Sequence, residues 1–137
     1  MWIDVIIGNP PYVNTEGMHA LLPSAEVEIY KKKYKTSHKQ FDKYFIFIEQ
    51  AINKINENGL VCYIVPNKFF KIGAGEKLRN LIAKERMLVS LDDFGDAQLF
   101  EDKTIYSSII LLSKAKQTSF VYSSVDSANK TVGRRKK

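Results

Sequence analysis

Four consecutive residues, Asn9-Pro10-Pro11-Tyr12, carry the groups needed to bind an amine on a flat ring. They follow the apolar run of residues 5–8, which is typical of a strand that ends abruptly. Proline at position 11 fixes its φ at about −65° and favours an extended residue before it. Two prolines in a row also remove two backbone N–H donors and leave carbonyl acceptors. With an amide before them and an aromatic ring after them, they predict a rigid pocket for an exocyclic amine on a planar base.

The longer motif Asp-Val-Ile-Ile-Gly-Asn-Pro-Pro-Tyr, residues 4–12, resembles the catalytic motif of amino-group methyltransferases that use S-adenosylmethionine. It is most similar to that of adenine-N6 DNA methyltransferases, particularly the methylase part of type IIG restriction–modification enzymes. The resemblance implies that the Asn9 side-chain oxygen and the Pro10 carbonyl accept hydrogen bonds from the target amine. It also implies that Tyr12 stacks on the base. These three residues are therefore the candidate catalytic residues.

The chemistry explains these residue types. An exocyclic amine is a poor nucleophile because its lone pair is delocalised into the ring. Two acceptors on its hydrogens favour the geometry in which the lone pair faces the methyl sulfonium, and they stabilise the positive charge that develops. No general base and no metal ion are required. The alternative interpretation is an ordinary loop, since Asn and Pro are common turn formers, but the preceding strand and the closing aromatic favour the methyltransferase interpretation.

Composition indicates one soluble globular domain, since the chain has 137 residues with 45% hydrophobic and 26% charged content. No apolar stretch is long enough to span a bilayer and no secretory signal pattern is present, so the expected location is the cytoplasm. Cys62 is the single cysteine, which excludes an internal disulfide, and its apolar neighbours predict a buried structural thiol. Two scattered histidines and one cysteine predict no metal site.

The net charge of +6 suits a polyanionic partner. A basic, aromatic-interleaved segment follows the Asn-Pro-Pro-Tyr segment, and five of its lysines are candidates for contacts with the DNA backbone, which position DNA without reading its sequence. These are Lys31, Lys32, Lys33, Lys35 and Lys39. A solvated lysine-rich surface explains the same pattern equally well. The basic run at residues 134–137 is more typical of a disordered tail.

Strands and helices alternate along the chain. We expect strands at residues 2–7, 60–65, 87–94 and 104–113, helices at 41–58 and 76–85, and a short helix within 26–34. Asn58-Gly59 would end the first long helix, and the strand at 60–65 would be buried on both faces. This order predicts an α/β fold with parallel strands and crossover helices. The short link before residue 104 permits a final antiparallel hairpin, which is how the resembled methyltransferases close their sheet. The resemblance therefore implies a partial Rossmann-like methyltransferase fold for this chain.

Two downstream segments extend the resemblance. Val-Pro-Asn-Lys-Phe at residues 65–69 is similar to the family's next strand exit, and it makes Asn67 and Lys68 candidate substrate-binding residues. The segment from Asp92 to Glu101 resembles a loop that carries a second aromatic against a flipped base. The resemblance implies that Phe100 stacks opposite Tyr12. A core ring at a strand end, and a simple turn, are the alternatives for these positions.

The resemblance covers residues 2–115, and we interpret residues 1–115 as the catalytic, substrate-side half of a methyltransferase domain. Residues 116–137 are expected to form a polar and basic tail with one possible strand at 119–125 and then a disordered end. The resembled enzymes bind S-adenosylmethionine at a Gly-rich turn before the Asn-Pro-Pro-Tyr strand, whereas here the single Gly-x-Gly, Gly73-Ala74-Gly75, comes later. We therefore expect the first strands to be missing, the cofactor-binding residues to be unknown, and the exposed sheet edge to pair with another chain.

The sequence thus predicts part of an adenine-N6 DNA methyltransferase of a restriction–modification system, inactive by itself. Its expected partners are DNA, the polypeptide that carries the cofactor-binding half, and a second copy through the sheet edge. Two alternatives stay open. The chain could be a noncatalytic nucleic-acid-binding or assembly module, or it could support the same chemistry on RNA or a protein side chain.

Overall fold

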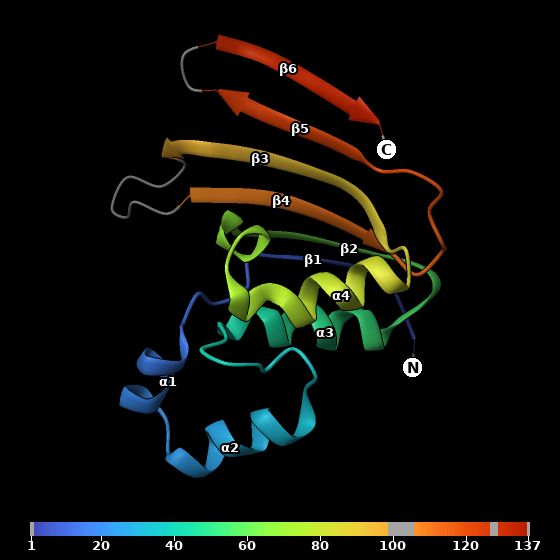
Figure 1. The fold of residues 1–137 in the computed structure, drawn as a ribbon. Coiled ribbons are helices and arrows are strands. Elements are labelled where there is room, and N and C mark those ends of the chain that lie inside the picture. Colours follow the sequence, from blue (N-terminus) through green and yellow to red (C-terminus); the bar gives the residue numbers. More distant parts are fainter. Residues whose placement is uncertain (1, 99–105, 127–128, 137) are drawn as a thin grey trace.

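The computed structural model describes residues 2–98, 106–126 and 129–136. Within these residues six strands form one mixed sheet in the order β1-β2-β4-β3-β5-β6 (Figure 1). The strands are β1 (Ile3–Gly8), β2 (Ile55–Pro66), β3 (Leu88–Gln98), β4 (Tyr106–Ser113), β5 (Val121–Asp126) and β6 (Asn129–Lys136). β1 and β2 are parallel, as are β3 and β5, whereas β4 runs antiparallel to both β2 and β3. The predicted α/β fold and its antiparallel hairpin, β3–β4, are confirmed.

In the described part of the chain, four α-helices accompany the sheet. They are α1 (Thr15–Leu21), α2 (Ser24–Lys33), α3 (Lys43–Lys54) and α4 (Glu76–Lys84), and two short 3-10 helices, η1 (Asn67–Phe70) and η2 (Gly73–Gly75), follow β2. α3 and α4 cover the same face of the sheet, and α1 and α2 lie beyond α3 (Figure 1). None of the helices in the described ranges has the length and apolar character needed to cross a membrane.

The core lies between this helical layer and the sheet. The apolar stripe of α3, with Tyr44, Phe45 and Ile48 fully buried, packs in one cluster with Val61 and Val65 of β2. α4 adds its own apolar face to the same cluster. Burial of such side chains contributes about 1.5–3 kcal/mol each, so this layer fixes how β1 and β2 lie against each other.

The predicted helix at 41–58 is too long at its carboxyl end. α3 ends at Lys54, because Ile55 adopts an extended conformation (φ −77°, ψ 152°) and its side chain is fully buried. Asn58 and Gly59 lie inside β2 instead of ending the helix. A Cβ at Gly59 would lie 2.6 Å from the Cβ of Ile55, so glycine is needed here for close packing within the strand.

Two further elements differ from the sequence prediction. α1 lies in a segment expected to be polar and without a helix, because only its Thr15 and Met18 are buried and the apolar periodicity is therefore weak. Its first turn is capped by the Asn14 side chain, which accepts a hydrogen bond from the Gly17 N–H at 2.8 Å. β6 occupies residues 129–136, where a disordered end was expected, and it pairs antiparallel with β5.

One face of the sheet is left without a helical cover among the described residues. Along β2 the residues alternate, so that Val61, Tyr63 and Val65 are buried and the intervening ones only half-buried. Cys62 is accordingly half-buried, and the predictions of a strand buried on both faces and of a buried thiol are wrong. β1 is an edge strand, and its Ile7 is 77% exposed. This face and the two edge strands, β1 and β6, are unpartnered in the described structure.

Candidate functional site

The Asn-Pro-Pro-Tyr segment leaves the sheet at the carboxyl end of β1. Because β1 and β2 are parallel, with Gly8 opposite Tyr63, the segments that follow the two strands emerge at the same edge. In open α/β sheets this is where ligands bind. Asn9 is exposed, Pro10 is buried and Tyr12 is half-buried. The structure therefore presents the Asn9 amide to solvent on a backbone held in place by its neighbours.

Tyr12 is held at its hydroxyl and along its ring. The hydroxyl donates to the Ile64 carbonyl oxygen of β2 at 2.9 Å, and it also lies within hydrogen-bond distance of Asn9 Oδ1. The ring meets Tyr44 edge-on, with centroids 6.1 Å apart and an interplanar angle of 83°. Burial, and secondarily the charge of Asp42, raises the pKa of Tyr12. The phenol is thus neutral at physiological pH and fixed beside Asn9.

An ion pair joins the segments that follow β1 and β2. Lys68 of η1 lies 3.1 Å from Asp42, between Nζ and Oδ2, and the Asp42 side chain is only 4% exposed. Asp42 forms an isolated β-bridge with Asn14, two residues beyond Tyr12. Its Oδ1 atom is buried without a hydrogen-bond partner in the described structure. Lys68 is therefore positioned by a buried carboxylate, and its ammonium lies at the sheet edge that carries the site.

The Tyr44 hydroxyl is buried beneath Tyr12. It comes near the backbone of Phe69 without forming a hydrogen bond of normal geometry in the described residues. Burial, with smaller effects of Asp42 and Tyr12, strongly raises the pKa of Tyr44. Two buried oxygens near Tyr12, Asp42 Oδ1 and Tyr44 Oη, therefore have unused hydrogen-bonding capacity in the described structure.

Asn67 is connected to β3 by a second polar link. Its Nδ2 donates to Asp93 Oδ1 at 2.8 Å and, at 3.3 Å, to the Gly95 carbonyl. Asp93 also accepts hydrogen bonds from the Gly95 N–H (3.0 Å) and from the Tyr122 hydroxyl (3.0 Å). Asp93, inside β3, thus joins η1, β3 and β5.

The structure brings Asn9, Pro10, Tyr12, Asn67 and Lys68 to segments at one edge of the sheet. Phe100, the predicted second aromatic, lies outside the described residues. Sequence reasoning missed Asp42, Asp93 and Tyr122. No local signal identifies these three, because each acts through a partner 26 or 29 residues away in the chain.

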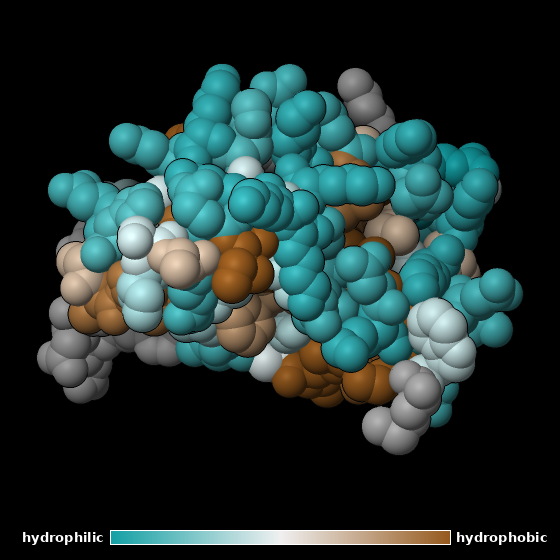
Figure 2. All heavy atoms as spheres, turned by 90° about the horizontal axis from the view of Figure 1, so that it is seen from below, coloured by the Kyte–Doolittle hydropathy of each residue, from teal (hydrophilic) through white to brown (hydrophobic). Residues whose placement is uncertain are grey.

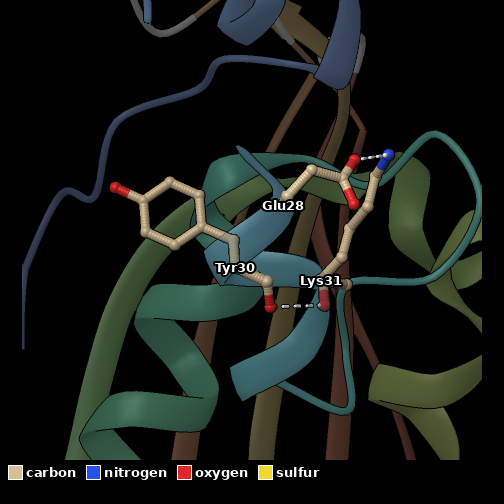
Figure 3. Close-up of polar contacts among 4 residues, drawn as sticks. Glu28, Tyr30 and Lys31 are labelled. Atoms are coloured by element: carbon tan, nitrogen blue, oxygen red, sulfur yellow. Dashed lines mark hydrogen bonds and ion pairs between the residues drawn. The ribbon is translucent and has the colours of Figure 1, made fainter. Parts of the chain in front are cut away.

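The candidate DNA-contacting lysines lie on α2 and just after it. Lys31 pairs with Glu28 at 3.0 Å, and Figure 3 shows this pair on one side of α2 with the Tyr30 ring pointing away from it. Lys33 lies over the Tyr34 ring at 5.4 Å. Lys32 and Lys35 are exposed, and the Lys39 ammonium lies beside Gly73 in η2. Hydrophilic side chains cover most of this side of the molecule (Figure 2).

Within the described residues we identify no adenosyl-binding site. The single Gly-x-Gly, in η2, is explained by packing, because a Cβ at Gly75 would lie 2.3 Å from the Phe69 carbonyl oxygen. No group of three or more His, Cys, Asp or Glu residues in the described ranges could hold a metal ion. An apolar cavity of about 970 Å³ lies between α4 and the β3–β5 part of the sheet, and none of residues 9–12 lines it.

Comparison with known proteins identifies relatives over most of the chain. Residues 1–100 match the family described as Eco57I restriction-modification methylase. The chain is 44% identical over 134 residues to the type II restriction enzyme and methyltransferase RM.Eco57I of Escherichia coli, covering 98% of this chain and 13% of that protein. It is 30% identical over 112 residues to the type II methyltransferase M.PaeR7I of Pseudomonas aeruginosa, covering 81% of this chain and 19% of that protein.

Solved structures share the fold at lower sequence identity. The DrdV–DNA complex superposes with a TM-score of 0.71 and 16% identity, covering 98% of this chain and 17% of that one. The type I restriction-modification system methyltransferase subunit from Streptococcus thermophilus superposes with a TM-score of 0.65 and 16% identity, covering 96% of this chain and 29% of that one. These matches show a partial Rossmann-like methyltransferase fold.

Proposed function

Since the chain belongs to the Eco57I restriction-modification methylase family, we propose that it forms the amine-binding part of a methyltransferase that acts on the N6 amine of adenine in DNA. The observation that carries this proposal is the exposed Asn9 amide at the end of β1, next to the buried Pro10 and the fixed ring of Tyr12. The chain spans only 13–19% of the length of the two relatives described above, so the whole protein's activity is part of the proposal.

In this proposal Asn9 Oδ1 and the Pro10 carbonyl accept the two hydrogens of the target amine. The amine lone pair then points away from both acceptors, toward the incoming methyl group. As the nitrogen gains its fourth bond it becomes positively charged, and the same two oxygens stabilise that charge. The Tyr12 ring stacks on the base, which offsets part of the cost of removing the base from the duplex. Phe100 is proposed to stack on its other face.

S-adenosylmethionine is the proposed cofactor and supplies the methyl group when bound. Since no adenosyl site is identified among the described residues, we propose that a further polypeptide segment binds the cofactor and pairs with the edge of β1. The exposed Val5 and Ile7 side chains of β1 support this association, because exposed apolar residues on an unpaired strand favour contact with another segment. Self-association of two copies would use the same edge. We expect no methyl transfer by the chain alone.

The lysines of α2 and the segment after it are proposed to contact DNA phosphates. Four of the five candidates, Lys32, Lys33, Lys35 and Lys39, form no ion pair with an acidic residue in the described ranges, so their charges remain available. Lys68, held by Asp42 near the carboxyl ends of β1 and β2, is proposed to contact the target nucleotide. DrdV, which shares the fold, was solved bound to DNA. Action on cellular DNA would place the protein in the cytoplasm.

The experiment that tests this proposal replaces the matching 134 residues of RM.Eco57I with this chain and measures methyl transfer from radiolabelled S-adenosylmethionine. Duplex DNA, RNA and protein acceptors compete in one assay, and the methylated product is identified by mass spectrometry. The proposal predicts N6-methyladenine in DNA. A different methylated acceptor would establish the same chemistry on another substrate. A folded chimera that binds DNA but methylates nothing would favour the noncatalytic module.

A further inference from the structure

The hydroxyl of Tyr12 faces two oxygen atoms but has only one proton. The Ile64 carbonyl oxygen lies 2.9 Å away, and Asn9 Oδ1 also lies within hydrogen-bond distance. A phenol can donate a single hydrogen bond, although its oxygen can also accept. The two acceptors therefore cannot both be satisfied by Tyr12. If both contacts are hydrogen bonds, one of them must use a proton from the neighbouring residue, and the Ile64 carbonyl has none to donate.

The Asn9 amide can supply that proton. Its oxygen and nitrogen are nearly isosteric, so a half-turn about χ2 places Nδ2 where Oδ1 lies. The Nδ2–H then donates to the Tyr12 oxygen, and Tyr12 donates to the Ile64 carbonyl of β2. This arrangement satisfies all three groups. It also leaves Asn9 Oδ1 on the side away from Tyr12, on an exposed residue.

We infer that the Tyr12 hydroxyl is a positioning group that accepts a hydrogen bond from Asn9 Nδ2 and thereby turns Asn9 Oδ1 toward the target amine. This inference rests on the proposed function of Asn9. The chain of contacts from Ile64 through Tyr12 to Asn9 ties a side chain of the exposed segment to a central strand of the sheet. The Tyr12 ring is restrained, because it forms a T-shaped contact with the fully buried Tyr44.

The inference gives Tyr12 two separable roles. The ring would stack on the base, and the hydroxyl would orient the amide. Burial raises the pKa of Tyr12, so the hydroxyl keeps the proton that it donates to Ile64 throughout the physiological pH range. Tyr12→Phe removes the second role and retains the first.

The first test uses the 137-residue chain itself and needs no activity. In ¹⁵N-labelled protein, one Asn9 Nδ2 proton should exchange with solvent more slowly than those of Asn80, an exposed residue of α4. Tyr12→Phe should abolish this protection. Tyr63→Phe is the control variant. Tyr63 directly precedes Ile64 in β2 and its side chain is buried in the core, so loss of its hydroxyl should leave the Asn9 signals unchanged. Equal and rapid exchange of both Asn9 protons in the unmodified chain would overturn the inference.

The second test measures the single-turnover rate of methylation in the RM.Eco57I chimera. Tyr12→Phe should lower this rate about tenfold, which corresponds to about 1.4 kcal/mol in the activation barrier. The affinity for DNA should change little, because the stacking ring is retained. Tyr63→Phe should not change the rate. An unchanged rate in Tyr12→Phe would overturn the positioning role.

The two proposals fail in different ways. If Asn9→Ala leaves methylation unchanged, the proposed function of Asn9 is wrong, and the positioning role that depends on it is wrong as well. If Asn9→Ala abolishes methylation but Tyr12→Phe has no effect on either the rate or the Asn9 amide signals, the proposed function stands and only the role of the Tyr12 hydroxyl is refuted.

Discussion

The ion pair between Asp42 and Lys68 is predicted to stabilise the site, because it joins the segments that follow β1 and β2. At a separation of 3.1 Å, two unit charges attract each other by about 1.3 kcal/mol in the dielectric of water and by about 5 kcal/mol at an effective dielectric of 20. The Asp42 side chain is almost fully buried but that of Lys68 is 47% exposed, so the coupling should lie near the lower value. We expect a coupling free energy of about 1–2 kcal/mol.

A double-mutant cycle measures this coupling. Lys68→Met leaves a buried carboxylate without its partner and should cost about 2 kcal/mol, less than the roughly 3–5 kcal/mol for a fully buried pair, because Lys68 is half-exposed. Asp42→Asn removes the buried charge, and the double variant should lose less than the sum of the two single variants. Unfolding in urea, followed by circular dichroism, is the appropriate assay, because guanidinium chloride would screen the charges.

A matched control is provided by Glu28 and Lys31, which form an exposed pair at 3.0 Å. Its coupling should be much smaller than that of Asp42 and Lys68, because water solvates both charges. Additive costs for Asp42→Asn and Lys68→Met, within experimental error, would show that the buried pair does not stabilise the two segments and would refute the reasoning.

Three further predictions concern stability and are checked by urea unfolding. Asp93→Ala leaves three donors without their acceptor and should cost about 2–4 kcal/mol, whereas Asn67→Ala should cost about 1 kcal/mol. Equal costs would contradict the role of Asp93 as the acceptor shared by Asn67, Gly95 and Tyr122. Tyr44→Phe removes a buried hydroxyl that lacks a good partner, so stability should be unchanged or higher by up to about 1 kcal/mol. Because burial raises the folded-state pKa of Tyr44, the free energy of unfolding should be unaffected by this group below about pH 10 and should fall as the pH rises further, a fall that Tyr44→Phe should reduce. Gly75→Ala should cost about 1–3 kcal/mol through overpacking against Phe69, whereas Gly73→Ala, whose Cβ would have only the Lys39 ammonium at 3.5 Å, should cost much less.

Local patterns in the sequence were sufficient for much of the fold. The apolar run before Asn9 ends at the predicted strand end, and the stripe of α3 faces the core as its spacing indicates. The carboxyl end of α3 was predicted wrongly because Ile55 continues the helical spacing of apolar residues while it belongs to β2. Periodicity alone cannot separate these two cases, since the side chain of Ile55 is buried in either conformation.

The predicted site residues come from motifs, and the structure adds the contacts that hold them. Asn9 and Tyr12 are three residues apart, but the Ile64 carbonyl that anchors Tyr12 lies 52 residues further along the chain. Asp42 resembles any acidic residue before a helix, and its role is visible only once β1 and β2 are side by side. No local sequence signal encodes which distant segments lie side by side, because that pairing is settled only when α3 packs against the sheet.

The most direct test of the central claim is the effect of Asn9→Ala on adenine methylation by the RM.Eco57I chimera, with DNA affinity measured on the same samples. Loss of one preorganised acceptor is expected to lower the single-turnover rate roughly 100- to 1,000-fold, while DNA affinity changes little. Asn80→Ala, on an exposed position of α4, is the matched control and should retain the full rate. A rate in Asn9→Ala equal to that of the control would contradict the proposal that Asn9 orients the target amine.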